Sequence, residues 1–162
     1  MKIDNLNKVI KNPSQFFVHI NNEIEIKRIN HDLDFDYIDG TIIIEYYDHL
    51  IMDFSLWDLV DQLWCYFIQL LEEVLQTGYG MTYFPEQPIK MEMKVVSNDL
   101  LLFSLDEGRK IRELLPMQEF MTAILKGAEN FYSSFTSYFD RKIDFSYELN
   151  KIHDIKVQLK CM

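Results

Sequence analysis

Apolar residues recur at helical spacing in two long segments of this sequence. The first segment runs from Ser55, a residue type favoured at helix N-caps, to Gly78, a natural C-terminal stop. The second begins at Pro116, because proline suits the first turn of a helix, and its apolar stripe continues to Tyr138. Gly127 interrupts this second stripe and indicates a close contact with a neighbouring element. We therefore expect two long amphipathic helices, each with a broad buried side.

Alternating and continuous apolar runs predict strands on both sides of the first helix. Residues 89–96 alternate, residues 100–105 form a buried run, and a short strand is expected over 109–114. Before the helix, residues 15–29 are interpreted as two short strands about an Asn-Asn turn. Residues 79–88 are interpreted as a turn-rich loop.

The clearest hairpin signal is Asp39-Gly40, a favoured type I′ turn pair. Strands over 33–38 and 41–47 would pair around it, and the register would sort the side chains onto two faces. Asp34 would then lie opposite Glu45 on the face away from the core. Directly opposed carboxylates weaken a strand pair, so a sequence selected for stability alone would avoid them.

The order of strands, helix, strands and helix predicts an α+β fold. We expect an antiparallel sheet of about six or seven strands with two long helices packed on one face. The chain has 162 residues, 48% of them hydrophobic, which suffices for one domain with its own core. The expected domain spans 1–162, with the core over about 15–139 and a C-terminal tail over 140–162 that shows a weak helical pattern.

Charge is distributed unevenly along the chain, whose formal net charge is −10. Residues 29–89 contain 12 Asp and Glu and no Lys or Arg, which leaves 14 acids and 16 bases in the remainder. Such a field repels nucleic acid and anionic membranes, and it attracts cationic partners in a salt-dependent way. We therefore expect a cationic protein partner, and neither nucleic acid nor membrane.

The sequence shows no apolar run clean enough for a secretory signal or a membrane span, so a cytoplasmic location is expected. The longest apolar stretch, residues 56–71, is interrupted by acids and amides. Two cysteines, Cys65 and Cys161, are too few for a disulfide framework or a zinc site, and both are expected as reduced thiols.

No motif in the chain names a reaction. It contains no G-x-S-x-G, H-E-x-x-H or Walker-type loop, so we expect neither catalysis nor a cofactor. An EF-hand loop beginning at Asp32 fails because Tyr37 and Ile43 stand where Gly and Glu are needed. A looser divalent site between Asp34 and Glu45 is chemically feasible, since opposed carboxylates can share a hard cation.

An acidic docking face is the leading interpretation of the 31–48 segment, because acids mixed with tyrosine suit an interface to a basic protein. The alternative is a solvated strand face without a partner. The expected central contacts are Asp32, Asp34, Asp36, Glu45 and Tyr47, with Asp48, Asp53, Asp58 and Asp61 as rim charges.

A second functional hypothesis is a small-ligand binding domain or an enzyme with a pocket between sheet and helices. Tyr79, Tyr83 and Phe84 would stand at the mouth of that pocket, or would plug the end of the core. A third hypothesis is a structural subunit that self-associates through an exposed apolar strand.

The segments GMTYFPEQPIKMEM, LLLFSL and LLPMQEFMTAILKGAENFY, in this order, resemble those of small bacterial immunity-type proteins of polymorphic and contact-dependent toxin systems. The resemblance covers about residues 31–139. It implies a compact acidic domain that binds a basic toxin domain, often a nuclease, and neutralises it by occlusion. It assigns no functional residue by position.

Overall fold

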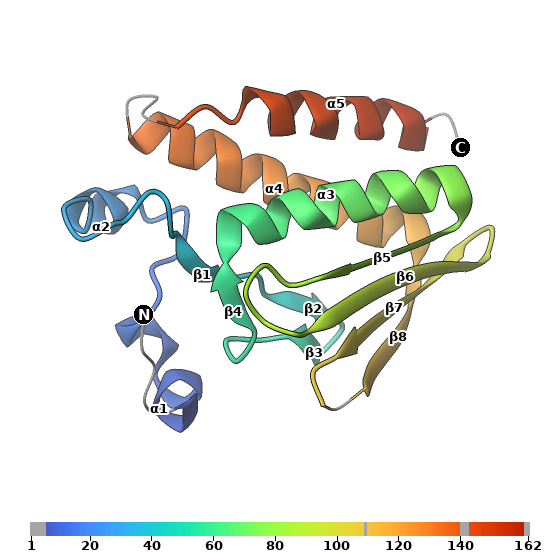
Figure 1. Cartoon of the computed structure of the whole chain (residues 1–162), viewed down its shortest axis with the longest axis horizontal. Helices are drawn as coiled ribbons and strands as arrows, with labels where there is room; N and C mark the ends of the chain where they lie inside the picture. The colour runs from blue at the N-terminus through green and yellow to red at the C-terminus, as the bar shows by residue number, and fades with distance from the viewer. Residues whose placement is uncertain (1–5, 109, 140–142, 161–162) are drawn as a thin grey trace.

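The computed structural model describes residues 6–108, 110–139 and 143–160 (Figure 1). The chain begins with short elements and ends with long ones. Its helices are α1 (Leu6–Lys11), the 3₁₀ helix η1 (Pro13–Gln15), α2 (Glu23–Arg28), α3 (Val60–Thr77), α4 (Met117–Tyr138) and α5 (Ser146–Lys160). Its strands are β1 (Asp39–Thr41), β2 (Ile44–Tyr46), β3 (His49–Met52), β4 (Trp57–Leu59), β5 (Tyr79–Tyr83), β6 (Lys90–Ser97), β7 (Leu100–Asp106) and β8 (Lys110–Pro116).

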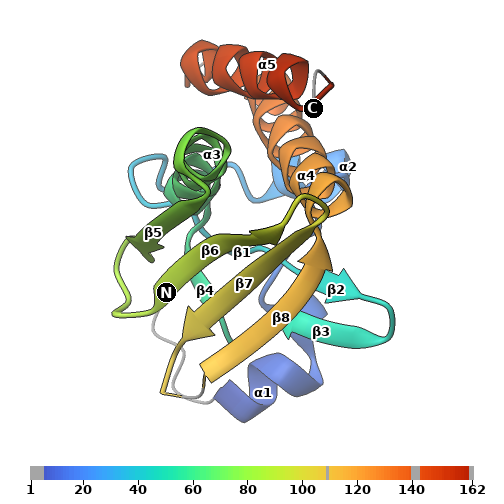
Figure 2. The ribbon, with the colours of Figure 1, turned by 90° about the vertical axis from the view of Figure 1, so that its right-hand side faces the viewer.

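The largest sheet is an antiparallel meander in the order β5-β6-β7-β8 (Figure 2). Alternate residues of its central strands are fully buried, among them Met91, Met93, Leu101 and Phe103. Helices α3 and α4 contact this sheet, and α5 contacts both helices from the other side, as the layers of Figure 1 show. The fold is therefore α+β, with α5 as an additional outer layer.

The expectation of one sheet of six or seven strands was wrong, because the strands form three separate antiparallel sheets. Strands β1 and β4 form one pair, and β2 and β3 form another. Each of these four strands is only three or four residues long.

The hairpin expected around Asp39-Gly40 does not form. Both residues lie in β1, where Asp39 pairs with Leu59 and Gly40 with Asp58. A Cβ at Gly40 would lie 2.7 Å from Cγ1 of Val60, so this glycine permits a close approach to the start of α3 and makes no turn. The tight turn of this region is instead Tyr47-Asp48, between β2 and β3.

Other local predictions in the first half were also wrong. Residues 15–29 form no strands, because Asn22 caps α2 and its side chain accepts the N–H of Glu25 at 3.3 Å. Helix α3 begins at Val60 and not at Ser55, whose backbone N–H and hydroxyl both donate to the Asp53 carboxylate. Residues 79–83, expected as loop, form the edge strand β5.

The second half follows the sequence more closely. Strands β6 and β7 occupy the two runs expected as strands. The third strand occupies Lys110–Pro116, and its expected first residue, 109, lies outside the described residues. Gly78 ends α3 with a φ of 77°, and α4 begins directly after Pro116. A Cβ at Gly127 would lie 2.7 Å from the Trp64 indole, which confirms the expected close contact.

The C-terminal tail contributes to the core. Ile152, Ile155 and Leu159 of α5 are buried in the same hydrophobic cluster as the sheet and the other long helices. Residues 140–142 of the tail, and Cys161 beyond it, lie outside the described residues. No helix in the described part of the chain has the length and hydropathy that crossing a bilayer requires.

Candidate binding surface

Three of the predicted contact residues lie in the connection between α2 and β1. Asp32, Asp34 and Asp36 are all exposed, and a carboxylate oxygen of Asp34 accepts the N–H of Asp36 at 3.0 Å. Tyr37 follows them with 60% of its surface exposed. We call these four residues the loop patch. Among the described residues, none forms an ion pair with its three carboxylates.

Three further predicted residues, Glu45, Tyr47 and Asp48, lie on the β2–β3 hairpin. All are exposed, and Tyr47 has 82% of its surface in solvent. The neighbouring Leu50 is 53% exposed. We call these four residues the hairpin patch. No cation of the described chain pairs with its carboxylates, although the adjacent His49 contacts Glu113 of β8 at 3.2 Å.

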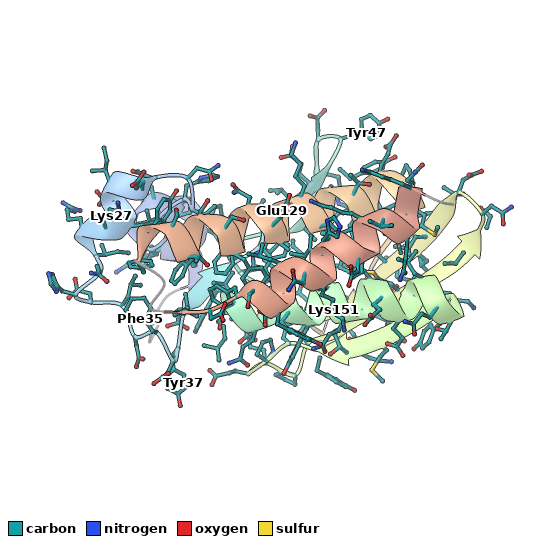
Figure 3. The ribbon with its side chains drawn as sticks, turned by 90° about the horizontal axis from the view of Figure 1, so that it is seen from above. Lys27, Phe35, Tyr37, Tyr47, Glu129 and Lys151 are labelled. Atoms are coloured by element: carbon teal, nitrogen blue, oxygen red, sulfur yellow. The ribbon has the colours of Figure 1, made fainter. Side chains whose placement is uncertain are left out.

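The two patches do not form one face. Figure 3 shows Tyr37 and Tyr47 on opposite sides of α4. The predicted strand register would have placed Asp34 against Glu45, but that register depended on a turn at Asp39-Gly40. Because these two residues belong to β1 and pair with β4, the acidic segment is divided into two surfaces.

Two of the remaining predicted acids, Asp58 and Asp53, accept hydrogen bonds from neighbouring parts of the chain. Asp58 is only 2% exposed, and its carboxylate accepts backbone N–H groups of Leu59 at 2.7 Å and of Glu86 and Gln87 at 3.2 Å. It therefore ties β4 to the connection between β5 and β6. Asp53 accepts two hydrogen bonds within its own turn, from Ser55.

Asp61 is partly buried at the start of α3, and this burial, followed by repulsion from Glu148, raises the pKa of its carboxyl group. Its backbone carbonyl accepts the Tyr132 hydroxyl at 2.8 Å. Cys65 lies one turn further along α3, and burial also raises the pKa of its thiol. A raised pKa keeps the thiol protonated and weakly nucleophilic.

The aromatic residues expected at a pocket mouth, Tyr79, Tyr83 and Phe84, are not among the residues that line the large cavity described below. Phe84 is 3% exposed and belongs to the core, which agrees with the plug alternative for this ring. Tyr79 and Tyr83 lie on the edge strand β5 and are 44% and 51% exposed. The Tyr79 hydroxyl donates to the Glu92 carboxylate at 2.7 Å, and hydrogen bonds from Lys90 and Tyr79 lower the pKa of Glu92.

A large cavity instead lies between the N-terminal segment, the β1–β2 region and α4. Its volume is about 1260 Å³, above the range of 300–1,000 Å³ that is common for ligand pockets. Its walls are mainly apolar: Phe17 from the N-terminal segment, Ile42 before β2, Trp64 of α3, and Phe120 and Phe131 of α4. Sequence reasoning missed this cavity, because its walls come from segments distant along the chain.

The carboxylates outnumber the basic groups in this cavity. Among the described residues, four carboxylates and one histidine, His19, line it and no Lys or Arg does; the four acids are Glu25, Asp39, Glu45 and Glu119. Glu45 and Glu119 are exposed, whereas Glu25 pairs with Arg28. Tyr46 also lines the cavity, and desolvation, then Tyr47 and Glu119, raises the pKa of its phenol.

In the described part of the chain, no three His, Cys, Asp or Glu side chains are grouped so that they could hold a metal ion. The divalent site considered for Asp34 and Glu45 loses its basis, because it required the two to be opposed on paired strands. Comparisons of the chain with protein-family models, curated proteins and solved structures gave no match.

Proposed function

We propose that this chain is a non-catalytic binding protein that docks a cationic protein on its hairpin patch and acts by occlusion, as immunity-type proteins do. The observation that carries the proposal is Tyr47, an 82% exposed aromatic residue at the tip of the β2–β3 hairpin between two acidic side chains. The partner class that the family resemblance implies is a basic toxin domain, such as a nuclease.

The backbone of Tyr47 supports a role other than stability. Its φ is 44°, the left-handed region in which hairpin turns favour Asn or Gly. A tyrosine there costs on the order of 1 kcal/mol or more. Its ring packs edge-on against Tyr46, with centroids 4.7 Å apart, yet 82% of the residue stays exposed, so burial offsets only part of that cost. Residues that break a local rule are expected at functional sites.

The side chains of the patch are those that interfaces use. Tyrosine supplies contact area and is enriched among residues that dominate binding energy. Glu45 and Asp48 stand beside it without a cationic neighbour in the described chain, so their field acts on an approaching partner. Residues 29–89, which include this hairpin, contain 12 acids and no Lys or Arg, so the segment itself contributes an acidic field.

The test is a pull-down from lysates of the source organism and related strains at low and high salt. Wild type is compared with a hairpin variant (Glu45→Gln, Asp48→Asn) and a loop variant (Asp32→Asn, Asp36→Asn), which lose equal charge on opposite sides of α4. We expect wild type and the loop variant to retain the same basic protein, and the hairpin variant to lose it. High salt should release it.

Kinetics with the captured protein then separate charge from contact. The hairpin variant should slow association severalfold, because its acids steer the encounter. Tyr47→Ala should instead speed dissociation by about tenfold or more, as loss of a central aromatic contact does. If both charge variants lose affinity for the captured protein equally, net charge alone explains the binding. If only the loop variant loses affinity, the docking surface is the loop patch and not the hairpin patch.

The cavity favours a second candidate function, a small-ligand binding domain, at a different place from the one expected. The sequence predicted a pocket at Tyr79 and Tyr83. The cavity instead lies between the N-terminal segment, the β1–β2 region and α4. Native mass spectrometry of purified protein tests this function. A stoichiometric small molecule that Ala123→Arg displaces would support it, and a mass equal to the bare chain would oppose it.

A further inference from the structure

The cavity opens along one side of α4. Glu119, Ala123 and Asn130 of this helix line it and are exposed, and Gly127 lies between the last two. Their spacing of three or four residues keeps them on one helix face. From Glu119 to Asn130 the rise is about 17 Å, or three helical turns. We call this part of the cavity the α4 groove.

The opposite wall of the groove is apolar and incompletely covered. Ile43, beside β2, lines it and is 41% exposed, and Phe16 and Phe17 of the N-terminal segment are only partly buried. Side chains that line an open hollow of this size lack the neighbours that a packed core would give them. An apolar occupant would restore those contacts.

The charged side chains of the groove favour an occupant with positive charge. Glu45 from β2 and Glu119 from the first turn of α4 are both exposed and both line the cavity. At the far end of the α4 face the groups are neutral amides, where Asn130 donates to the side chain of Asn21 at 2.9 Å. No Lys or Arg of residues 6–108, 110–139 or 143–160 lines the cavity. The groove therefore complements an apolar surface that carries positive charge.

We propose that the α4 groove receives a basic amphipathic helix of the partner, an inference that rests on the proposed function. Amphipathic helices bind by laying their apolar face into a hydrophobic groove, with anchors at i, i+3, i+4 and i+7. A partner helix of about 11 residues matches the length of the groove. Its lysines or arginines meet Glu45 and Glu119, and the hairpin patch contacts the adjoining surface of the same partner.

Charge argues against a second copy of this chain as the occupant. The chain carries a net charge of −10, so another copy would bring like charge to an acidic rim. A basic amphipathic segment can pair its positive charges with the acidic rim and pack its apolar side chains against the apolar wall. A small cationic amphiphile shares part of this chemistry, and the test separates it from a helix.

The probe is a synthetic peptide of leucine and lysine, about 14 residues long, with its leucines at helical spacing. One control peptide has the same composition with leucines on all faces, and a second has glutamate in place of lysine. Binding is followed by the fluorescence of Trp64, which lines the cavity, in a Trp57→Phe background that leaves it as the single tryptophan.

Two α4 variants provide a matched comparison. Ala123→Arg places a bulky cation in the groove, four residues after Glu119. Ser133→Arg places the same side chain at an exposed position outside the cavity, four residues after Glu129. Both change the net charge equally and both place the arginine four residues after a glutamate, of which Glu129 is already paired with Lys156. Circular dichroism and melting temperature confirm that each variant is folded.

We expect the amphipathic basic peptide to bind wild type and Ser133→Arg with similar affinity, and Ala123→Arg at least tenfold more weakly. Both control peptides should bind weakly to all three proteins. If the peptide with leucines on all faces binds as tightly as the amphipathic peptide, the proposal is wrong, because charge alone would then explain binding. Dodecylamine that saturates the Trp64 signal while the peptide gives none would also overturn it, in favour of a small amphiphile.

The same variants keep this proposal distinct from the proposed function. If Ala123→Arg binds the captured cationic protein like Ser133→Arg, while the Glu45, Asp48 variant does not bind it, the groove proposal is wrong and hairpin docking stands. If the hairpin variant binds that protein like wild type, the proposed function itself fails.

Discussion

The two halves of this molecule are built differently. From Tyr79 onward the chain forms strands of five to eight residues in one meander, followed by helices of 22 and 15 residues. Before Val60 it forms strands of three or four residues in two separate pairs, with helices of no more than six residues. The two pairs and the meander are three separate sheets, and Figure 2 shows β2 and β3 to one side of the meander, next to β8.

This difference separates stability from binding. The regular half contributes most of the fully buried side chains, among them Met91, Phe103, Leu125 and Tyr132. The irregular half carries both acidic patches and most walls of the cavity. Binding surfaces commonly lie on less regular segments that a rigid scaffold positions. The regular half is the scaffold in this interpretation.

The largest effect on the free energy of unfolding is expected from a comparison of one phenylalanine from each half. Phe103 is 0% exposed and its ring lies 5.3 Å from that of Phe120, whereas Phe17 is partly buried and packs on Phe54 at 5.4 Å. Phe103→Ala should lower the free energy of unfolding by about 3–5 kcal/mol. Phe17→Ala should lower it by about 1 kcal/mol, since less area is lost. Urea denaturation measures both, and equal losses would remove the distinction between the halves.

The next effect concerns Asp58, which joins the two halves. Asp58→Ala leaves the buried N–H groups of Leu59 and Gln87 without their acceptor, so the free energy of unfolding should fall by about 3 kcal/mol. Asp36→Ala, at an exposed acid of the loop patch, should change it by less than about 0.5 kcal/mol. Thermal melting of both variants is the measurement. Equal melting temperatures would show that Asp58 does not hold the halves together.

The smallest effect is at Asp61, whose pKa is raised above the ordinary value of 3.8, chiefly by burial. A raised folded-state pKa means that the protonated acid stabilises the fold, and this contribution is lost as pH rises through that pKa. Asp61→Asn should therefore raise the melting temperature at neutral pH, and the gain should vanish as pH falls below the ordinary value. Glu86→Gln, at an exposed acid, controls for the lost charge. A gain that persists unchanged in acid would contradict this account.

The regular half was largely predictable from its sequence. Strands β6 to β8, the end of α3 at Gly78 and the start of α4 follow from periodicity and capping signals, which are local properties. The first half was mispredicted because its local signals compete. Asn22 serves a helix cap and not a turn, and Gly40 serves a close approach to Val60 and not a hairpin.

The candidate surface was predictable in part. Charge alone identified an acidic region, and Asp32, Glu45 and Tyr47 are exposed as expected. Its division into two patches was not predictable, because it depends on which strand β1 pairs with. The burial of Asp58 depends likewise on a segment 28 residues further along the chain.

The amino-acid sequence alone sets the charge of each segment and the period of each long element, since both depend on neighbouring residues. Which segments meet is set by three-dimensional packing. The pairing of β1 with β4, the separation of the acidic patches and the cavity beside α4 all arise from contacts between distant residues. These contacts form only when the chain buries its apolar surface as a whole, because no short segment contains both partners.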